Sequence, residues 1–97
     1  MYVVRNVFTT KPGKARELVA KFQAARPHLE ADGRHGLRIL TDAVAGFWTV
    51  VVESEVEDLT EFLGQARGGM RSTAAAEAME GYMDLVEGGY REVFVVE

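Results

Sequence analysis

"LRILTDAVAGFWTVVVESE", residues 37–55, contains two runs of β-branched and aromatic side chains on either side of a short link. Such side chains favour strands, and a link as short as "AVAG" suits a hairpin. We therefore expect strands at residues 37–42 and 47–55, paired as antiparallel neighbours. The second run, "FWTVVV", is apolar at nearly every position, whereas a strand with one wet face would alternate. This pattern predicts that both faces of the sheet are buried.

On the N-terminal side of this hairpin, the sequence predicts a strand followed by a helix. Residues 2–10, "YVVRNVFTT", have high strand propensity, and the turn-forming "KPG" ends the run. Apolar residues then recur at helical spacing from Ala15 to Leu29. Because Pro27 lacks a backbone donor and crowds the preceding turn, we expect this helix to kink or end near Arg26.

On the C-terminal side, the sequence predicts two helices and a last strand. Ser54 and Glu57 have the spacing of a capping box, which predicts a helix start near Val56. The glycines of "GQARGG" end this helix, and a further helix follows as far as "EGG". The apolar stripe of that further helix comprises Ala75, Ala78, Met79, Tyr82, Leu85 and Val86. Residues 90–97, "YREVFVVE", then form a fourth strand.

This order of elements predicts an α+β fold of the ferredoxin-like split βαβ type (β-α-β-β-α-α-β). A chain of 97 residues supports one core, so we expect a single domain over residues 1–97. Its four-stranded antiparallel sheet would have helices on one face only. Since the strands have the pattern of strands buried on both faces, we expect a second copy to cover the other face, giving a symmetric homodimer. The alternative is a monomer with an exposed apolar sheet face.

Charge and composition argue against several classes of partner. The formal net charge of -4 opposes the phosphate attraction that dominates nucleic-acid binding, so we expect no nucleic-acid partner. No stretch approaches the roughly 20 apolar residues of a membrane helix, and we expect no membrane association. The absence of cysteine removes thiolate ligands and fits a cytoplasmic protein. His28 and His35 lack the spacing of a helical metal pair, so we expect no metal site.

At this level the sequence resembles a known group of proteins, the dimeric α+β barrel superfamily. The resemblance rests on the element order, on "PGK" at the start of the first helix, on residues 36–62 and on the closing apolar strand. It is similar in particular to the antibiotic biosynthesis monooxygenase-like and NIPSNAP-like small domains. The resemblance implies two ferredoxin-like subunits that join their sheets into a barrel, with a pocket between each sheet and its helices.

The resemblance also bears on individual residues. Cofactor-free oxygenases and haem-degrading members of the group have an asparagine on the first strand and a glycine seven residues later, and Asn6 and Gly13 match that spacing. Haem-degrading members add a tryptophan and a histidine on later helices. This chain has Phe62 near the tryptophan position and no histidine in residues 70–86, which argues against haem degradation.

Asn6 is the polar residue that the first strand pattern singles out. It shares a strand face with Val4 and Phe8, so it is buried if that face meets the helices. A buried amide needs hydrogen-bond partners, because leaving it unsatisfied costs about 1 to 3 kcal/mol. Both a structural hydrogen bond and a ligand contact remain open for it.

Other candidates also have two interpretations each. Trp48 packs in the core or dimer, or forms a wall against a ligand. His35 is a general base or a loop residue. Arg71 lies beside "GGM", in a connection that could also gate a pocket. The strand arginines at positions 5, 38 and 91 form ion pairs with strand carboxylates, or bind a carboxylate or phenolate ligand.

Two functional hypotheses follow. The first is a homodimeric barrel protein that binds a small organic ligand between sheet and helices, or whose interior is filled by its own side chains. The second is a cofactor-independent, monooxygenase-like enzyme acting on an electron-rich aromatic or quinol-type substrate, and neither hypothesis requires a cofactor. The candidate catalytic residues are Asn6, Tyr82 and His35, and the candidate ligand-binding residues are Trp48, Phe62, Arg71 and Met79.

Overall fold

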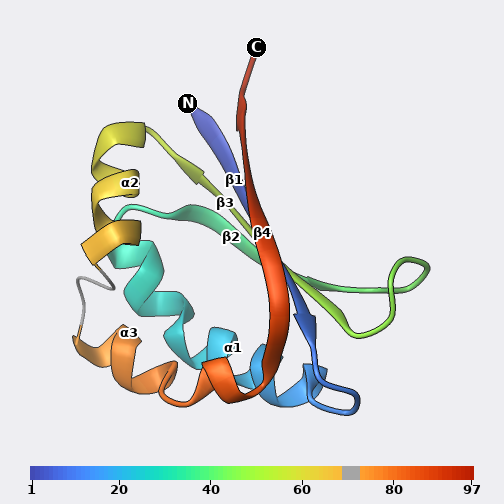
Figure 1. Ribbon diagram of the computed structural model, residues 1–97. Helices are drawn as coiled ribbons and strands as arrows, with labels where there is room; N and C mark the ends of the chain where they lie inside the picture. The colour runs from blue at the N-terminus through green and yellow to red at the C-terminus, as the bar shows by residue number, and fades with distance from the viewer. Residues whose placement is uncertain (69–72) are drawn as a thin grey trace.

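A computed structural model describes residues 1–68 and 73–97 of the protein. The elements follow one another in the predicted order β-α-β-β-α-α-β, with a short 3₁₀ turn before the last strand (Figure 1). They are β1 (Tyr2–Thr10), α1 (Ala15–Ala31), β2 (His35–Thr41), β3 (Thr49–Val56), α2 (Leu59–Gly68), α3 (Thr73–Ala78), η1 (Tyr82–Asp84) and β4 (Val86–Val95).

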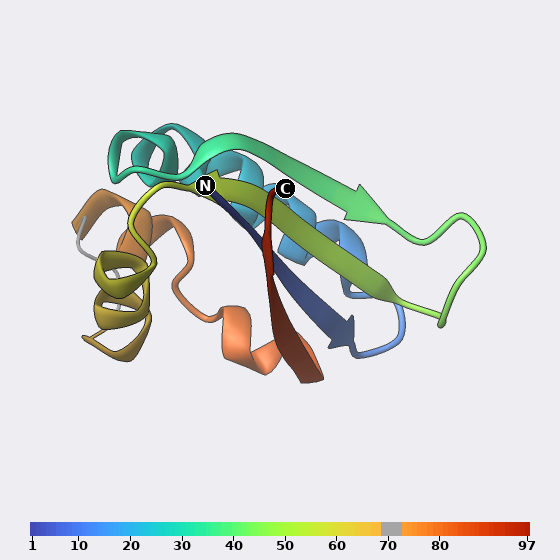
Figure 2. The same cartoon turned by 90° about the horizontal axis from the view of Figure 1, so that it is seen from above.

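The strands form one antiparallel sheet in the order β2-β3-β1-β4. Helices α1, α2 and α3 lie on one face of this sheet and leave the opposite face open (Figure 1). The β2–β3 hairpin extends beyond the helices, as the view from above shows (Figure 2). The α+β class, the antiparallel sheet and the one-sided helical layer are therefore as the sequence predicts.

The main core lies between α1 and the two strands β2 and β3. Leu18, Phe22 and Leu29 of α1 are buried against Val50 and Val52 of β3, as the helical and strand periodicities require. A second, smaller cluster lies under α2 and consists of Val4, Val56 and Phe62. Full burial of such side chains contributes about 1.5 to 3 kcal/mol each, so these two clusters fix the helices on the sheet.

The chain turns from β1 into α1 at Lys11–Lys14. The backbone N–H of Lys14 donates to the carbonyl of Lys11 at 3.0 Å, which closes a four-residue turn. Pro12 occupies its second position, and Gly13 occupies the third with φ +79°. A type II turn has these preferences, because its third residue adopts the left-handed region that glycine enters at no steric cost. The predicted break at "KPG" is confirmed.

Helix α1 does not end at Arg26, so the predicted end there is wrong. The helix continues through Pro27 to Ala31. Pro27 removes one hydrogen bond to the carbonyl of Gln23, but both residues are exposed, so water can solvate that carbonyl. Burial of Leu29, which lies beyond the proline, stabilises the additional turn of helix.

Helix α2 begins later than the capping-box pattern predicts. Ser54 is buried within β3 and Val56 ends that strand, so neither belongs to a helix. Asp58 caps α2 instead, since its Oδ1 accepts a hydrogen bond of 2.9 Å from the backbone N–H of Glu61. Residues 54–56 form a strand and not a helix because their antiparallel pairing with β1 extends to Val56.

The last strand begins earlier than predicted, at Val86, and includes Gly88 and Gly89, where the sequence pattern predicted the end of the preceding helix. A Cβ atom at Gly89 would lie 2.4 Å from the carbonyl oxygen of Val7, so β4 approaches β1 too closely there for any side chain. Helix α3 ends at Ala78, and Tyr82 belongs to the 3₁₀ turn η1. The predicted long helix to Val86 is therefore wrong.

The hairpin boundaries also shift. β3 begins at Thr49, not at residue 47, and β2 begins at His35 and ends at Thr41. Trp48 has φ +60°, which breaks the extended conformation before β3. It lies in the hairpin connection together with Phe47, whose side chain is 86% exposed.

The open face of the sheet carries a row of alternating charges across all four strands. Register aligns Arg38 of β2, Glu53 of β3, Arg5 of β1 and Glu92 of β4 in that order. The side chains of Arg38 and Arg5 both bond the Glu53 carboxylate, and Arg5 lies 3.9 Å from Glu92. The predicted pairing of strand charges is confirmed for these four residues.

Candidate functional site

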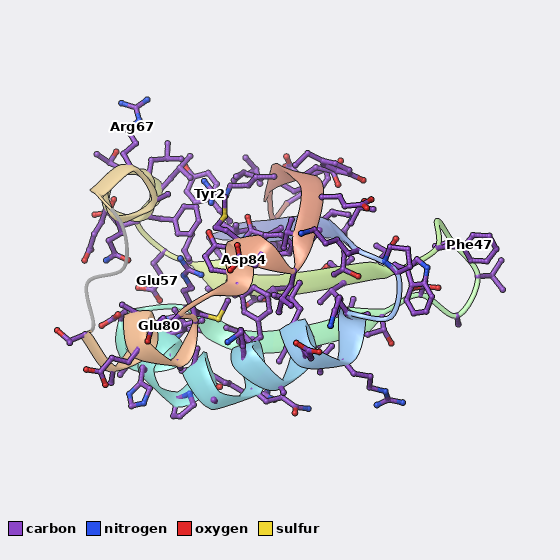
Figure 3. All side chains as sticks on the ribbon, turned by 60° about the horizontal axis from the view of Figure 1, so that its bottom comes forward. Tyr2, Phe47, Glu57, Arg67, Glu80 and Asp84 are labelled. Carbon is purple, nitrogen blue, oxygen red and sulfur yellow. The ribbon has the colours of Figure 1, made fainter. Side chains whose placement is uncertain are left out.

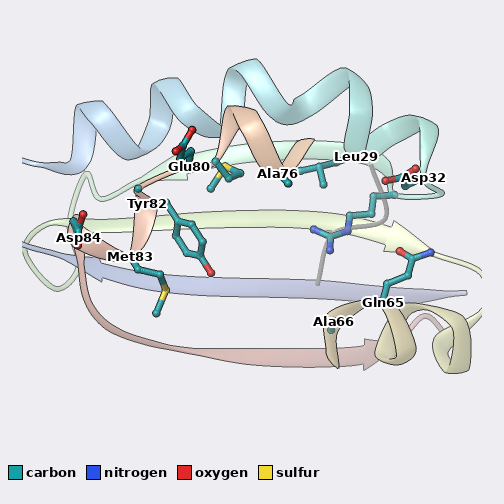
Figure 4. Close-up of a pocket in the computed structure, with 12 residues that line it drawn as sticks. Leu29, Asp32, Gln65, Ala66, Ala76, Glu80, Tyr82, Met83 and Asp84 are labelled. Carbon is teal, nitrogen blue, oxygen red and sulfur yellow. The ribbon is translucent and has the colours of Figure 1, made fainter. Parts of the chain in front are cut away.

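A cavity of about 460 Å³ lies between the C-terminal end of α1, helix α2 and the α3–η1 segment. Its volume falls in the range of small-molecule sites. Figure 4 shows Tyr82, Met83 and Asp84 at one end of the cavity and Asp32 and Gln65 at the other. The apolar lining comes from Leu29, Ala66, Ala76, Met79 and Met83, and the polar lining includes Asp32, Arg34, Gln65, Glu80, Tyr82 and Asp84.

The end of helix α1 places Arg34 at this cavity. Gly33 has φ +102°, and the N–H groups of Gly33 and Arg34 bond the carbonyls of Glu30 and Leu29 at 3.1 and 3.2 Å. Such bonds from residues just past a helix end satisfy its last carbonyls. The chain thereby turns from α1 toward β2 with Arg34 at the boundary of the cavity.

Arg34 is half-buried, and one atom of its guanidinium is enclosed. Its Nε atom is shielded from solvent and has no hydrogen-bond partner among the described residues. The guanidinium carbon lies 5.2 Å from the centre of the Phe62 ring, a favourable cation–π distance. Burial lowers the pKa of Arg34, the charge of Arg91 lowers it further, and Asp32 opposes this shift.

Arg91 of β4 approaches the same ring from the sheet. Its guanidinium carbon lies 5.3 Å from the centre of the Phe62 ring. Its Nε donates a hydrogen bond of 2.7 Å to Oδ1 of Asn6, its cross-strand neighbour. Asn6 is thus connected to the Phe62 cluster through Arg91, and it is half-buried on the helix side of the sheet.

The structure distributes the sequence-predicted residues over several places. Met79 and Tyr82 line the cavity of about 460 Å³. His35 and Phe62 line an adjoining smaller cavity of about 170 Å³, which also includes Arg34. Asn6 lines neither cavity.

Two further candidates lie elsewhere. Trp48 is 43% exposed in the β2–β3 hairpin, whose Phe47 extends away from the end of the molecule that carries Arg67 and Glu80 (Figure 3). Arg71 lies outside the described residues. Trp48 and Met79 are therefore not brought together into one pocket.

Sequence reasoning missed Arg34, because its segment "GRHG", residues 33–36, is typical only of a turn. An arginine between a helix and a strand is normally solvated, and no periodicity marks this one as buried. Its partial burial follows from the packing of α2 on β1 and β3, which places Phe62 within cation–π distance of the Arg34 guanidinium.

The site can bind a molecule with apolar and polar parts. Met79 and the alanine and leucine side chains supply an apolar surface, Tyr82 supplies a hydroxyl, and Arg34 supplies a cation. Over residues 1–68 and 73–97, no group of three or more histidine, aspartate or glutamate side chains could hold a metal ion. No helix in that part of the chain combines the length and apolar character of a bilayer-crossing segment.

No protein-family model and no curated protein matches the sequence. Solved structures do match it in shape. A NIPSNAP domain protein from Burkholderia xenovorans superposes with a TM-score of 0.78 at 15% identity, covering 100% of this chain and 95% of that one. A protein from Nitrosomonas europaea, described as an antibiotic biosynthesis monooxygenase, gives a TM-score of 0.76 at 12% identity, covering 99% and 98% of the two chains.

The fold is that of the NIPSNAP and antibiotic biosynthesis monooxygenase-like proteins. A variant of MhuD, solved with two manganese protoporphyrin IX molecules per active site, also has this fold. It gives a TM-score of 0.71 at 23% identity, covering 99% of this chain and 94% of that one. The resemblance seen in the sequence is confirmed at the level of the fold.

Proposed function

We propose that the protein is a homodimeric α+β barrel protein that binds a small organic ligand in the cavity between α1, α2 and the α3–η1 segment. The observation that carries this proposal is the cavity of about 460 Å³ with its apolar walls and few polar groups. Ligand sites in proteins have this combination, in which apolar surface supplies affinity and polar groups fix orientation. Met79 and Tyr82 contact the ligand in this proposal.

The open face of the sheet supports the homodimer. Beside the charged row runs an apolar row formed by Leu40, Val51, Val7 and Tyr90, and Phe94 lies on the other side of the charges. Tyr90 is 62% exposed and Phe94 is 45% exposed in one chain. A second sheet packed on this face would bury these rings and strengthen the charged row by excluding water. The resemblance to dimeric barrels implies the same arrangement.

A monooxygenase-like activity on an electron-rich aromatic or quinol-type substrate is the second candidate. The Tyr82 hydroxyl at the cavity favours it, because a phenol can donate to a substrate oxygen. The likeness to a protein described as a monooxygenase is consistent with it. Oxygen consumption with 1,4-dihydroxynaphthalene, compared between the protein and Tyr82→Phe, tests this candidate. Equal consumption with and without protein would contradict it.

A native mass spectrum of the purified protein tests the main proposal, since it measures subunit number and retained small molecules together. We expect a dimer that carries an organic mass, released when the protein is denatured. A bare dimer that takes up none of a panel of aromatic compounds would contradict ligand binding and leave a structural role. A monomer at all concentrations would contradict the dimer.

A further inference from the structure

Two arginines share one aromatic ring beside the cavity. Arg34 and Arg91 have their guanidinium carbons 5.2 and 5.3 Å from the centre of the Phe62 ring. Among residues 1–68 and 73–97, neither guanidinium has a carboxylate within 4.0 Å, whereas Arg5 and Arg38 both do. Two cations therefore flank Phe62 with no carboxylate from the described residues in contact with either.

The described residues satisfy the charge of Arg34 only in part. A guanidinium removed from water needs hydrogen-bonding partners, and the shielded Nε of Arg34 has none among the described residues. The positive charge of Arg91 adds repulsion, which agrees with the lowered pKa of Arg34. Asp32 attracts Arg34 from beyond 4.0 Å, and this attraction offsets the effects of burial and of Arg91 only in part. Functional sites often contain groups that are unfavourable for stability, and here a bound anion would supply the negative charge that Arg34 lacks.

We infer that the ligand of the cavity carries a carboxylate, which is bound by Arg34 at the end of the cavity near α2. This inference rests on the proposed ligand-binding function and specifies the ligand class. A guanidinium matches a carboxylate through paired N–H donors, and the charge of both partners strengthens the hydrogen bonds. The apolar body of the ligand would then lie against Ala66, Ala76 and Met79.

Arg34 sets the orientation, because acidic residues line both ends of the cavity. Glu80 and Asp84 lie away from the end that holds Asp32 and Gln65 (Figure 4). The Arg34 guanidinium is the cation that the described lining supplies, so the charged end of the ligand is directed toward it. Arg91 adds attraction at that end without lining the cavity itself.

The test compares two probes that differ only in charge, 2-naphthoate and 2-naphthamide, by calorimetric titration at low salt. For the unmodified protein we expect 2-naphthoate to bind at least about tenfold more tightly, the effect of one charge-assisted contact. Arg34→Gln should remove this preference, because it should weaken the binding of 2-naphthoate at least about tenfold and the binding of 2-naphthamide less. Arg16→Gln removes an exposed arginine that lines neither cavity, and should keep the preference.

The outcomes separate this inference from the proposed function. If both probes bind the unmodified protein equally, the cavity binds ligands but the carboxylate inference is overturned, even if Arg34→Gln fails to fold. If Arg34→Gln folds and keeps the preference, Arg34 is not the anion-binding residue. If neither probe binds at millimolar concentration, the proposed ligand site itself fails.

Discussion

The side chain of Arg91 donates to the amide oxygen of Asn6 at 2.7 Å across the β1–β4 pair. This contact explains why a polar amide lies between Val4 and Phe8 on the helix-facing side of β1. Asn6 supplies a neutral acceptor that fixes the Arg91 guanidinium near Phe62. A carboxylate in its place would neutralise that cation.

Replacing Asn6 tests this contact. Asn6→Leu should lower the free energy of unfolding by about 1 kcal/mol, because one hydrogen bond to a charged but exposed group is lost. A double-mutant cycle with Arg91→Met, measured by urea unfolding, should give a coupling energy of similar size. Additive effects of the two substitutions would show that the hydrogen bond contributes nothing.

Glu53 should make stability depend on pH. The hydrogen bonds from Arg38, and next those from Arg5, hold the pKa of Glu53 below its ordinary value. A carboxylate with a lowered folded-state pKa stabilises the fold above its unfolded-state pKa of about 4.3, and the effect is lost as pH falls through the folded-state pKa.

Glu53→Gln should therefore lower the free energy of unfolding at pH 7 by about 1 kcal/mol. The difference from the unmodified protein should shrink between pH 5 and pH 3, roughly the interval around these pKa values. Glu92→Gln is the control, since Glu92 is 41% exposed and lies 3.9 Å from Arg5. A Glu53 effect that is independent of pH would contradict the assignment.

Val7 tests the dimer interface. It lies on the central strand β1 within the apolar row of the open face. Val7→Lys would bury an unpaired cation twice in a symmetric dimer, and should raise the dimer dissociation constant at least about a hundredfold. Light scattering coupled to size exclusion measures this, with circular dichroism to verify folding. Ala24→Lys, an exposed position on α1, should leave the dimer intact.

Pro27 lies inside helix α1, where we expect it to lower the free energy of unfolding. Pro27→Ala restores a helical hydrogen-bond donor inside α1 and should raise the free energy of unfolding by about 1 to 3 kcal/mol. Pro12→Ala is the matched control, because Pro12 lies in the turn before α1, where a proline stiffens the chain favourably. That substitution should lower stability by up to about 1 kcal/mol. Equal changes at the two prolines would argue against this account.

Gly89 should tolerate no side chain. Gly89→Ala places a Cβ atom 2.4 Å from the Val7 carbonyl oxygen, and should lower the free energy of unfolding by about 2 to 3 kcal/mol as β4 shifts. Gly88→Ala is the control, because a Cβ atom there meets nothing within 4 Å. Thermal unfolding of both variants measures the contrast. A stable Gly89→Ala protein would contradict the close strand approach.

The sequence by itself determined the order and type of the elements. Helical and strand periodicities are local properties, since a side chain's direction follows from the backbone conformation of its own segment. The alternation around Asn6 and the spacing from Ala15 to Leu29 therefore predicted β1 and α1, and the apolar run of β3 predicted the hairpin.

Only the tertiary structure decided where several elements end. Ser54 has the local signature of a helix cap, but pairing with β1 holds it in a strand. Pro27 has the local signature of a helix end, but burial of Leu29 extends the helix past it. Packing energy outweighed local preference at both positions, including the cost of about 3 kcal/mol of a proline inside a helix.

The candidate site depended on the tertiary structure most of all. Arg34, Phe62 and Arg91 lie in three elements far apart along the chain, and no local pattern connects them. They meet because the sheet order places β4 beside β1, and α2 packs Phe62 on Val4 of β1 and Val56 of β3. The surroundings of a charged side chain depend on all the segments around it, so the sequence showed only an arginine between a helix and a strand, and the fold placed it beside Phe62 at the cavity.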